Sequence, residues 1–159
     1  MDHSQLRDAM ERHGPSVYRL ALCRLQNTAD AEDVYQDVFL RLYQQNTQGW
    51  DGERTKAWLL RSAVNRCADI GRFRLRQRSL PLEEAAGLAA PADREQRELW
   101  AAVAALPPKF RTVVHLHYAE GYSTAEIAAL LFLPASTVRT RLHRAREQLK
   151  TLLGGNDDA

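Results

Sequence analysis

Residues 122–150 constrain the fold of this chain more than any other stretch. Ser123 and Glu126 have the spacing of an S-x-x-E capping box, which predicts that a helix begins at Thr124. Ile127, Ala128 and Leu131 give this helix one apolar side. A short break follows over residues 132–135. Its proline, Pro134, is expected to open the first turn of a second helix, because its fixed φ and missing N–H suit that position.

The second helix is expected to be amphipathic, with a strongly basic outer face. Its apolar residues recur at i, i+4, i+7 and i+11: Val138, Leu142, Ala145 and Leu149. A short helix, a tight turn and a basic amphipathic helix are typical of a helix-turn-helix, whose second helix enters the major groove. An ordinary pair of solvated helices is the alternative, but that outer face carries little acid besides Glu147. The face comprises Thr137, Arg139, Thr140, Arg141, His143, Arg144, Arg146 and Lys150.

Length and composition indicate a globular protein. The 159 residues allow one ordinary domain or two small ones. No apolar run approaches the ~18 residues of a membrane span, and the N-terminus lacks the apolar segment of a signal peptide. We therefore expect a cytoplasmic protein. Cys23 and Cys67 stand in apolar helical positions and are expected to be buried free thiols, with a disulfide or metal pair as the less favoured alternative.

Charge is distributed in blocks along the chain, although the net charge is only +2. Residues 54–79 hold eight Lys or Arg against one acid, and residues 99–153 hold seven against three. Residues 1–53 hold five against nine, and residues 80–98 hold two against five. Two basic blocks between acidic ones predict two nucleic-acid surfaces and a separate partner surface. The pI of 8.7 is below the ~9 of a strong DNA-binding domain, so we expect the chain to need a partner to hold DNA.

The first half of the chain is expected to form four helices. The first two cover residues 5–13 and a segment from Val17 onward, with a break at Gly14-Pro15. The third covers residues 29–45, with Thr28 as its N-cap and an inner face of Ala31, Val34, Tyr35, Val38 and Leu42, flanked by Phe39. Its outer face carries Asp33, Gln36, Asp37 and Leu40. An apolar centre with a polar rim suits protein docking, although a lone surface Leu is also common.

The fourth helix is expected from Arg54 to Arg72 or beyond, after a loop at residues 46–53. Ala57, Leu60, Ala63, Val64 and Cys67 are expected to face inward. Basic residues interleaved with an aromatic ring and an amide suit single-stranded nucleic acid, because arginines follow phosphates while rings and amides meet unstacked bases. The alternative for the tryptophan is a half-buried core position. The outward residues are Trp58, Arg61, Ser62, Asn65, Asp69 and Arg72, and a basic run with Arg74 and Arg76 follows them.

Proline and glycine mark a linker before the second half. Pro81, Gly87 and Pro91 interrupt residues 80–93, and a second helical domain is expected from Arg94. Its first helix is expected to use Leu99, Val103 and Leu106 and to stop at Pro107-Pro108; its second is expected to use Phe110, Val113, Val114 and Tyr118.

Three segments in this order resemble bacterial RNA polymerase sigma factors, and the short two-domain chain resembles their extracytoplasmic-function (ECF) group. Residues 30–43 (DAEDVYQDVFLRLY) resemble the core-polymerase-binding helix. Residues 58–69 (WLLRSAVNRCAD) resemble the melting and −10 recognition helix. Residues 106–111 (LPPKFR), 120–123 (EGYS) and 138–146 (VRTRLHRAR) resemble the −35-binding domain.

The resemblance implies a role for each surface. Asp33, Gln36, Asp37 and Leu40 would contact the clamp of core polymerase. Trp58, Arg61, Asn65, Arg72, Arg74 and Arg76 would meet the melted −10 strand. Arg139, Thr140 and His143 would reach bases of the −35 element. Thr137 would lie beside them, with Arg141, Arg144, Arg146 and Lys150 on phosphates or packed along the helix. Promoter DNA, core polymerase and an anti-sigma factor are the implied partners; no cofactor, metal or small-molecule substrate is expected.

The turn of the helix-turn-helix departs from the family, which usually has Gly where this chain has Phe132. Two conformations are open. Residue 132 adopts a positive φ with its ring covered by apolar surface, or it keeps a negative φ and continues the first helix. The apolar residues 130–133 favour ring burial.

The sequence therefore predicts an all-α, non-enzymatic initiation factor with two small helical domains. Residues 1–79 would form the first domain, 80–93 a linker, 94–153 the helix-turn-helix domain and 154–159 a tail. The chief alternative is a stand-alone helix-turn-helix regulator of duplex DNA, which would not need the basic surface of residues 54–78. A metal-dependent nucleic-acid enzyme is a third possibility, but its best ligands, His115 and His117, point about 200° apart on a helix.

Overall fold

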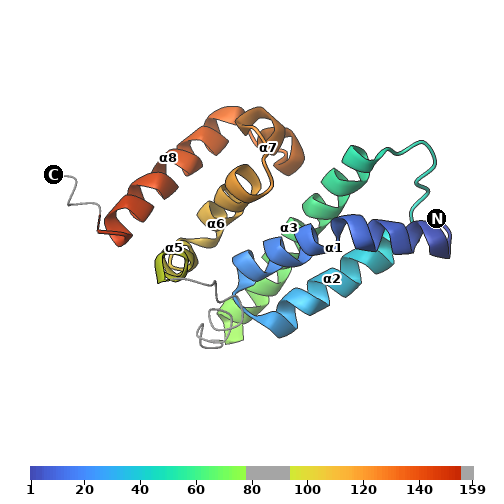
Figure 1. Cartoon of the computed structure of the whole chain (residues 1–159), viewed down its shortest axis with the longest axis horizontal. Coiled ribbons are helices and arrows are strands. Elements are labelled where there is room, and N and C mark those ends of the chain that lie inside the picture. Colours follow the sequence, from blue (N-terminus) through green and yellow to red (C-terminus); the bar gives the residue numbers. More distant parts are fainter. Residues whose placement is uncertain (78–93, 155–159) are drawn as a thin grey trace. The chain divides into compact units, whose positions relative to one another are not determined.

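The computed structural model describes residues 1–77 and 94–154, with side chains described through residue 74 and again from residue 94. Every regular element in these ranges is a helix (Figure 1), which confirms the all-α prediction. The chain divides into two compact units, Met1–Pro81 and Leu82–Ala159. The predicted linker at residues 80–93 and the predicted tail at residues 154–159 lie outside the described residues, except for Gly154.

A single long helix, α1 (His3–Leu25), replaces the two short helices predicted for the N-terminus. The predicted break at Gly14-Pro15 is wrong. A proline inside a helix costs about 3 kcal/mol, but Val17 and Leu20 are fully buried just beyond it, and each such burial contributes about 1.5–3 kcal/mol. Gly14 has a packing role instead, because a Cβ there would lie 3.0 Å from the Tyr35 hydroxyl.

The helix α2 (Thr28–Tyr43) begins at the predicted cap, one residue earlier than expected. Asn27, not Thr28, is the N-cap, and its side-chain oxygen accepts a hydrogen bond from the Asp30 N–H at 2.9 Å. The predicted inner face is confirmed for Ala31, Val34, Val38, Phe39 and Leu42, which are buried, while Tyr35 is half-buried.

The helix α3 (Gly52–Gln77) starts two residues earlier than predicted. The Asp51 carboxylate accepts a hydrogen bond from the Arg54 N–H at 2.8 Å and so caps it. Leu60, Ala63 and Cys67 are buried as predicted, but Leu59 is buried too, and Ala57 and Val64 are only half-buried. The inner face is therefore wider than a single stripe, because both α1 and α2 contact α3 (Figure 1).

Neither cysteine forms a disulfide, and both are buried, as predicted. Burial raises the pKa of the Cys67 thiol to about 12. Because a thiolate is the reactive form, Cys67 is an inert apolar residue of the core near neutral pH.

The second unit contains α5 (Arg94–Ala104), α6 (Pro108–Val114), a π-helical turn η1 (His115–Ala119), α7 (Thr124–Leu131) and α8 (Ala135–Leu152). Leu106, Val114 and Ala145 form one cluster of its core, with Phe110 and Leu149 packed against them. Of the apolar residues expected to define α5, Leu99 is exposed and Val103 is only half-buried. Only the C-terminal part of α5 meets the core, where Ala102 and the following Leu106 are buried.

The turn η1 explains a second departure from prediction. The Glu120 N–H donates to the His115 carbonyl at 3.1 Å, an i→i+5 bond that adds one residue to the turn. This extra residue shifts the helical register after Val114. Tyr118 was predicted to share the inner face with Val113 and Val114; it is exposed instead.

The helix-turn-helix forms as predicted from α7 and α8. Both hydrogen bonds of the capping box between Ser123 and Glu126 are present. Ile127 and Ala128 are buried, but Leu130 takes the core position predicted for Leu131, which is half-buried. Pro134 is the N-cap of α8 rather than part of its first turn.

Phe132 ends α7 in the left-handed conformation, with φ 58° and ψ 45°. Of the two conformations left open by the sequence, positive φ is therefore correct. The expected ring burial is wrong, because Phe132 is 77% exposed. The chain thus places an aromatic residue where glycine is favoured, and burial of the ring offsets little of the cost.

Candidate polymerase- and DNA-contacting surfaces

The outer face of α2 has an exposed leucine among polar side chains, as predicted. Leu40 is 58% exposed, and Gln36 and Asp33 are exposed one and two turns before it, respectively. Asp37 is less available to a binding partner, because arginines of this chain already contact its carboxylate. Its Oδ2 lies 3.2 Å from Arg41 Nε and 3.5 Å from Arg66 Nε, and both contacts are ion pairs rather than hydrogen bonds. This face therefore offers an apolar centre with a polar rim, the usual composition of a docking site. We call it the Leu40 face.

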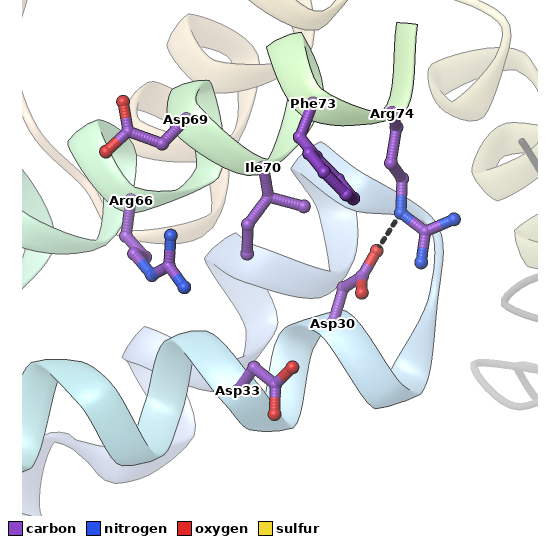
Figure 2. Close-up of a pocket in the computed structure, with 7 residues that line it drawn as sticks. All are labelled: Asp30, Asp33, Arg66, Asp69, Ile70, Phe73 and Arg74. Carbon is purple, nitrogen blue, oxygen red and sulfur yellow. Dashed lines mark ion pairs between the residues drawn. The ribbon is translucent and has the colours of Figure 1, made fainter. Parts of the chain in front are cut away.

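A pocket of about 440 Å³ lies between α2 and α3, beside this face (Figure 2). Asp33 is common to the pocket and to the Leu40 face. An ion pair between Arg74 and Asp30 crosses from α3 to α2, and Ile70 and Phe73 supply apolar surface. The remaining lining residues are Arg66 and Asp69.

Ion pairs alter the expectation for the basic end of α3. Arg74 was assigned to DNA, but the structure pairs it with Asp30, and its side chain is only 27% exposed. Arg72 is exposed and pairs with Asp69 on the same helix. The side chain of Arg76 lies outside the described residues. Any phosphate that binds Arg72 or Arg74 must therefore compete with a carboxylate.

Aromatic and amide groups gather at the other end of the predicted single-strand surface. Asn65 is exposed, and Trp58 and Arg61 are half-buried. The ring of Trp50 lies 6.1 Å from that of Trp58, and the Arg54 guanidinium lies 4.7 Å from the Trp50 ring centroid. Trp50 and Arg54 were not among the predicted site residues. Trp50 could have been found from the sequence, because it directly precedes Asp51, the cap of α3, and must therefore lie beside the first turn of that helix.

The outer face of α8 is arranged as predicted for a recognition helix. Val138, Leu142 and Ala145 are buried on the inner side. Thr137 and Arg141 border them and are half-buried. The remaining predicted residues project into solvent: Arg139, Thr140, His143, Arg144 and Lys150.

The two histidines considered as metal ligands have other partners. His115 Nε2 lies 3.1 Å from Glu120 Oε2, and both side chains are buried. His117 Nδ1 lies 2.8 Å from the Tyr122 carbonyl oxygen. Within residues 1–77 and 94–154, no group of three His, Cys, Asp or Glu side chains could hold a metal ion. Across the same ranges, no helix has the length and apolar character to cross a membrane.

The structure thus shows an all-helical protein that combines a helix-turn-helix unit with a separate helical unit carrying an exposed leucine face and a basic helix. Family models agree with this division. The model for Sigma-70 region 2 matches residues 9–79, and the model for Sigma-70, region 4 matches residues 96–149.

Individual relatives point to one group within that family. The ECF RNA polymerase sigma factor SigE of Mycolicibacterium smegmatis is 35% identical over 156 residues, which cover 92% of this chain and 60% of SigE. The ECF RNA polymerase sigma factor SigW of Bacillus subtilis is 31% identical, covering 96% of this chain and 90% of SigW. The chain belongs to the ECF sigma factors, which are non-catalytic subunits that direct RNA polymerase to promoters.

Solved structures show the same fold. CnrH in complex with the cytosolic domain of CnrY is 28% identical with a TM-score of 0.68, covering 97% of this chain and 90% of CnrH. RpoE of Bartonella quintana, in complex with the anti-sigma factor NepR, has a TM-score of 0.75 at 22% identity, covering 94% of this chain and 97% of RpoE. At that lower identity the RpoE match supports the fold alone.

Proposed function

We propose that the Leu40 face is the surface through which this chain binds core RNA polymerase. The observation that carries the proposal is the exposure of Leu40 on the same outer face of α2 as Asp33, Gln36 and Asp37. Removing a large apolar side chain from water on docking is favourable, while the polar rim sets orientation. Asp37 contributes through its existing pairs with Arg41 and Arg66, so its role is to shape the face rather than to add a free charge.

The two units divide promoter recognition between them. Residues 1–79 bind polymerase and the −10 region, residues 94–153 bind the −35 region, residues 80–93 connect them and residues 154–159 form a tail. On α8, Arg139, Thr140 and His143 reach base edges from the first half of the helix, as recognition helices do. The basic side chains around them bind phosphates, which position the helix without reading sequence; these are Arg141, Arg144 and Lys150, with Thr137 beside them at the helix start.

Promoter opening is assigned to the exposed edge of α3. Trp58, supported by the Trp50 ring, offers a stacking surface, and Asn65 offers an amide to an unpaired base. Arg61 lies between Trp58 and Asn65 on α3. Arg72 and Arg74 contribute less, because each exchanges an existing aspartate partner for a phosphate. Arg76 continues the basic run beyond them.

An anti-sigma factor is the proposed regulator. CnrH, 28% identical to this chain, was solved with the cytosolic domain of CnrY bound. An inhibitor that covers the Leu40 face would exclude polymerase by direct competition. Because polymerase and promoter DNA are the partners, we place the protein in the cytoplasm.

Substitution of Leu40 tests the docking proposal. Leu40→Asp should weaken core polymerase binding by more than about 30-fold, the effect of losing an interface hot spot of about 2 kcal/mol. Helicity should be unchanged because the side chain faces solvent. Fluorescence anisotropy of the labelled full chain against core polymerase measures the affinity. Leu99→Asp, at a similarly exposed leucine in the second unit, is the matched control.

Two outcomes of the Leu40→Asp experiment would contradict the docking proposal. Unchanged polymerase affinity for Leu40→Asp would move the docking surface elsewhere. Loss of helical circular dichroism would show that Leu40 has a core role that its exposure does not reveal.

A further inference from the structure

A tyrosine from the turn before the helix-turn-helix contacts an arginine of the recognition helix. The Arg146 Nε donates a hydrogen bond to the Tyr118 hydroxyl at 2.7 Å, across 28 residues of sequence. The guanidinium carbon lies 5.8 Å from the Tyr118 ring centroid, so the ring also attracts the charge. Both side chains are exposed, and Tyr118 is 58% exposed. The contact is therefore located on the surface, where it adds little to the core.

Tyr118 is itself held in place. It lies in η1, whose i→i+5 hydrogen bond turns it away from the core. The neighbouring His117 ring meets it edge-on, with centroids 4.7 Å apart and planes at 83°. His117 in turn contacts the Tyr122 carbonyl oxygen at 2.8 Å. Contacts with its own neighbours along the chain thus fix the position of Tyr118, independently of its contact with Arg146.

This geometry leaves the binding end of Arg146 available. A guanidinium carries five N–H donors, and the tyrosine uses the one on Nε. The four on the two terminal nitrogens remain for another acceptor. Within the described residues, no carboxylate forms an ion pair with Arg146, in contrast to Arg72 and Arg74. Arg146 is thus oriented by a neutral partner, with no described carboxylate paired to it.

The position of Arg146 along α8 indicates what that acceptor is. Arg139, His143, Arg146 and Lys150 recur at i, i+4, i+7 and i+11, so they share one exposed stripe. At 1.5 Å per residue, Arg146 lies about 10.5 Å along the axis from Arg139. The major groove is about 12 Å wide. When Arg139 is over base edges, Arg146 therefore lies near the groove margin, where the phosphates are.

We propose that Tyr118 is a positioning residue that presents the terminal nitrogens of Arg146 to a backbone phosphate beside the upstream promoter element. The inference rests on the proposed role of α8 and adds a residue outside the helix-turn-helix to it. A fixed arginine loses less conformational freedom on binding than a mobile one, so the tyrosine increases affinity without touching DNA. The contact carries no sequence information, because phosphates are alike along the duplex.

The test is a double-mutant cycle in the holoenzyme formed by the full chain with core polymerase. Tyr118→Phe removes the hydroxyl and keeps the ring, and should lower affinity for a duplex promoter fragment about twofold to tenfold. It should leave the salt dependence unchanged, because no charge is removed. Arg146→Ala should reduce the slope of log affinity against log salt by about 0.9, the value for one phosphate contact. In the Arg146→Ala background, Tyr118→Phe should have no further effect.

Matched controls separate this effect from a loss of folding. Tyr18→Phe removes a hydroxyl from the first unit and should leave affinity unchanged. Both single variants should weaken cognate and mutated upstream elements equally. Additive effects of Tyr118→Phe and Arg146→Ala, or unchanged affinity of Tyr118→Phe, would overturn the positioning role. If the unsubstituted holoenzyme shows no preference for the cognate element, the proposed function of α8 fails instead.

Discussion

The left-handed turn at Phe132 provides a quantitative test of how this helix-turn-helix is stabilised. A residue with a Cβ costs about 1–2 kcal/mol in this conformation, and Phe132→Gly removes that cost. Glycine also gives the unfolded chain more freedom, which costs about 0.4–1 kcal/mol. The ring is 77% exposed, so about a quarter of a burial worth 1.5–3 kcal/mol is lost, or about 0.4–0.7 kcal/mol. The opposing effects nearly cancel, and we expect the unfolding free energy to change by less than about 1 kcal/mol.

Phe132→Ala separates the backbone effect from the ring. Alanine also loses the ring contact but keeps the Cβ, so it retains the cost of positive φ. We therefore expect Phe132→Gly to be more stable than Phe132→Ala by about 0.5–1 kcal/mol. Thermal unfolding of the full chain, followed through amide NMR signals of α7 and α8, measures the second unit separately from the first. For a domain of this size, 1 kcal/mol corresponds to about 4–8 °C.

Two outcomes would refute this reasoning. A loss of several kcal/mol in Phe132→Gly would show that the ring is an ordinary core group, against its exposure. A more stable alanine variant, by the roughly 0.4–1 kcal/mol that glycine costs through the unfolded chain, would show that the positive φ of Phe132 carries no strain.

Three further predictions concern the DNA surfaces. Asn65→Ala should impair promoter opening more than recruitment, because the amide is proposed to meet an unpaired base. A pre-melted template should therefore restore activity. Equal loss of activity on duplex and pre-melted templates would argue against that role. Arg139→Ala should relax preference for the upstream element by about 1–3 kcal/mol if the contact is bidentate to guanine, measured by competition between cognate and mutated elements. Lys150→Ala should instead weaken binding to all sequences and lower the salt slope, and an equal loss of Arg139→Ala at both elements would exclude base reading.

Periodicity and capping were sufficient to predict most of the fold. The capping box at Ser123, the inner stripe of α8 and the exposed Leu40 all follow from local spacing, and all are present. These features are local, because each depends on residues within a few helical turns. The three candidate surfaces could be predicted from the same patterns, because each lies on a single helix: α2, α3 or α8.

The errors occur where tertiary contacts outweigh local preference. Pro15 does not break α1, because burial of the following residues is stronger than the cost of the proline. Tyr118 leaves the expected face because η1 adds a residue that no simple 3.6-residue pattern contains. Arg74 meets Asp30 on a different helix, a contact that a helical wheel of α3 cannot show.

Transcription with purified core polymerase tests the central claim most directly. Run-off reactions on a library of templates with randomised upstream and −10 elements would be compared with and without this chain. Our account predicts transcripts that depend on the chain and come from templates sharing two separated sequence elements. Leu40→Asp should abolish these transcripts. The absence of chain-dependent transcripts, together with tight sequence-specific duplex binding by the chain alone, would contradict the account.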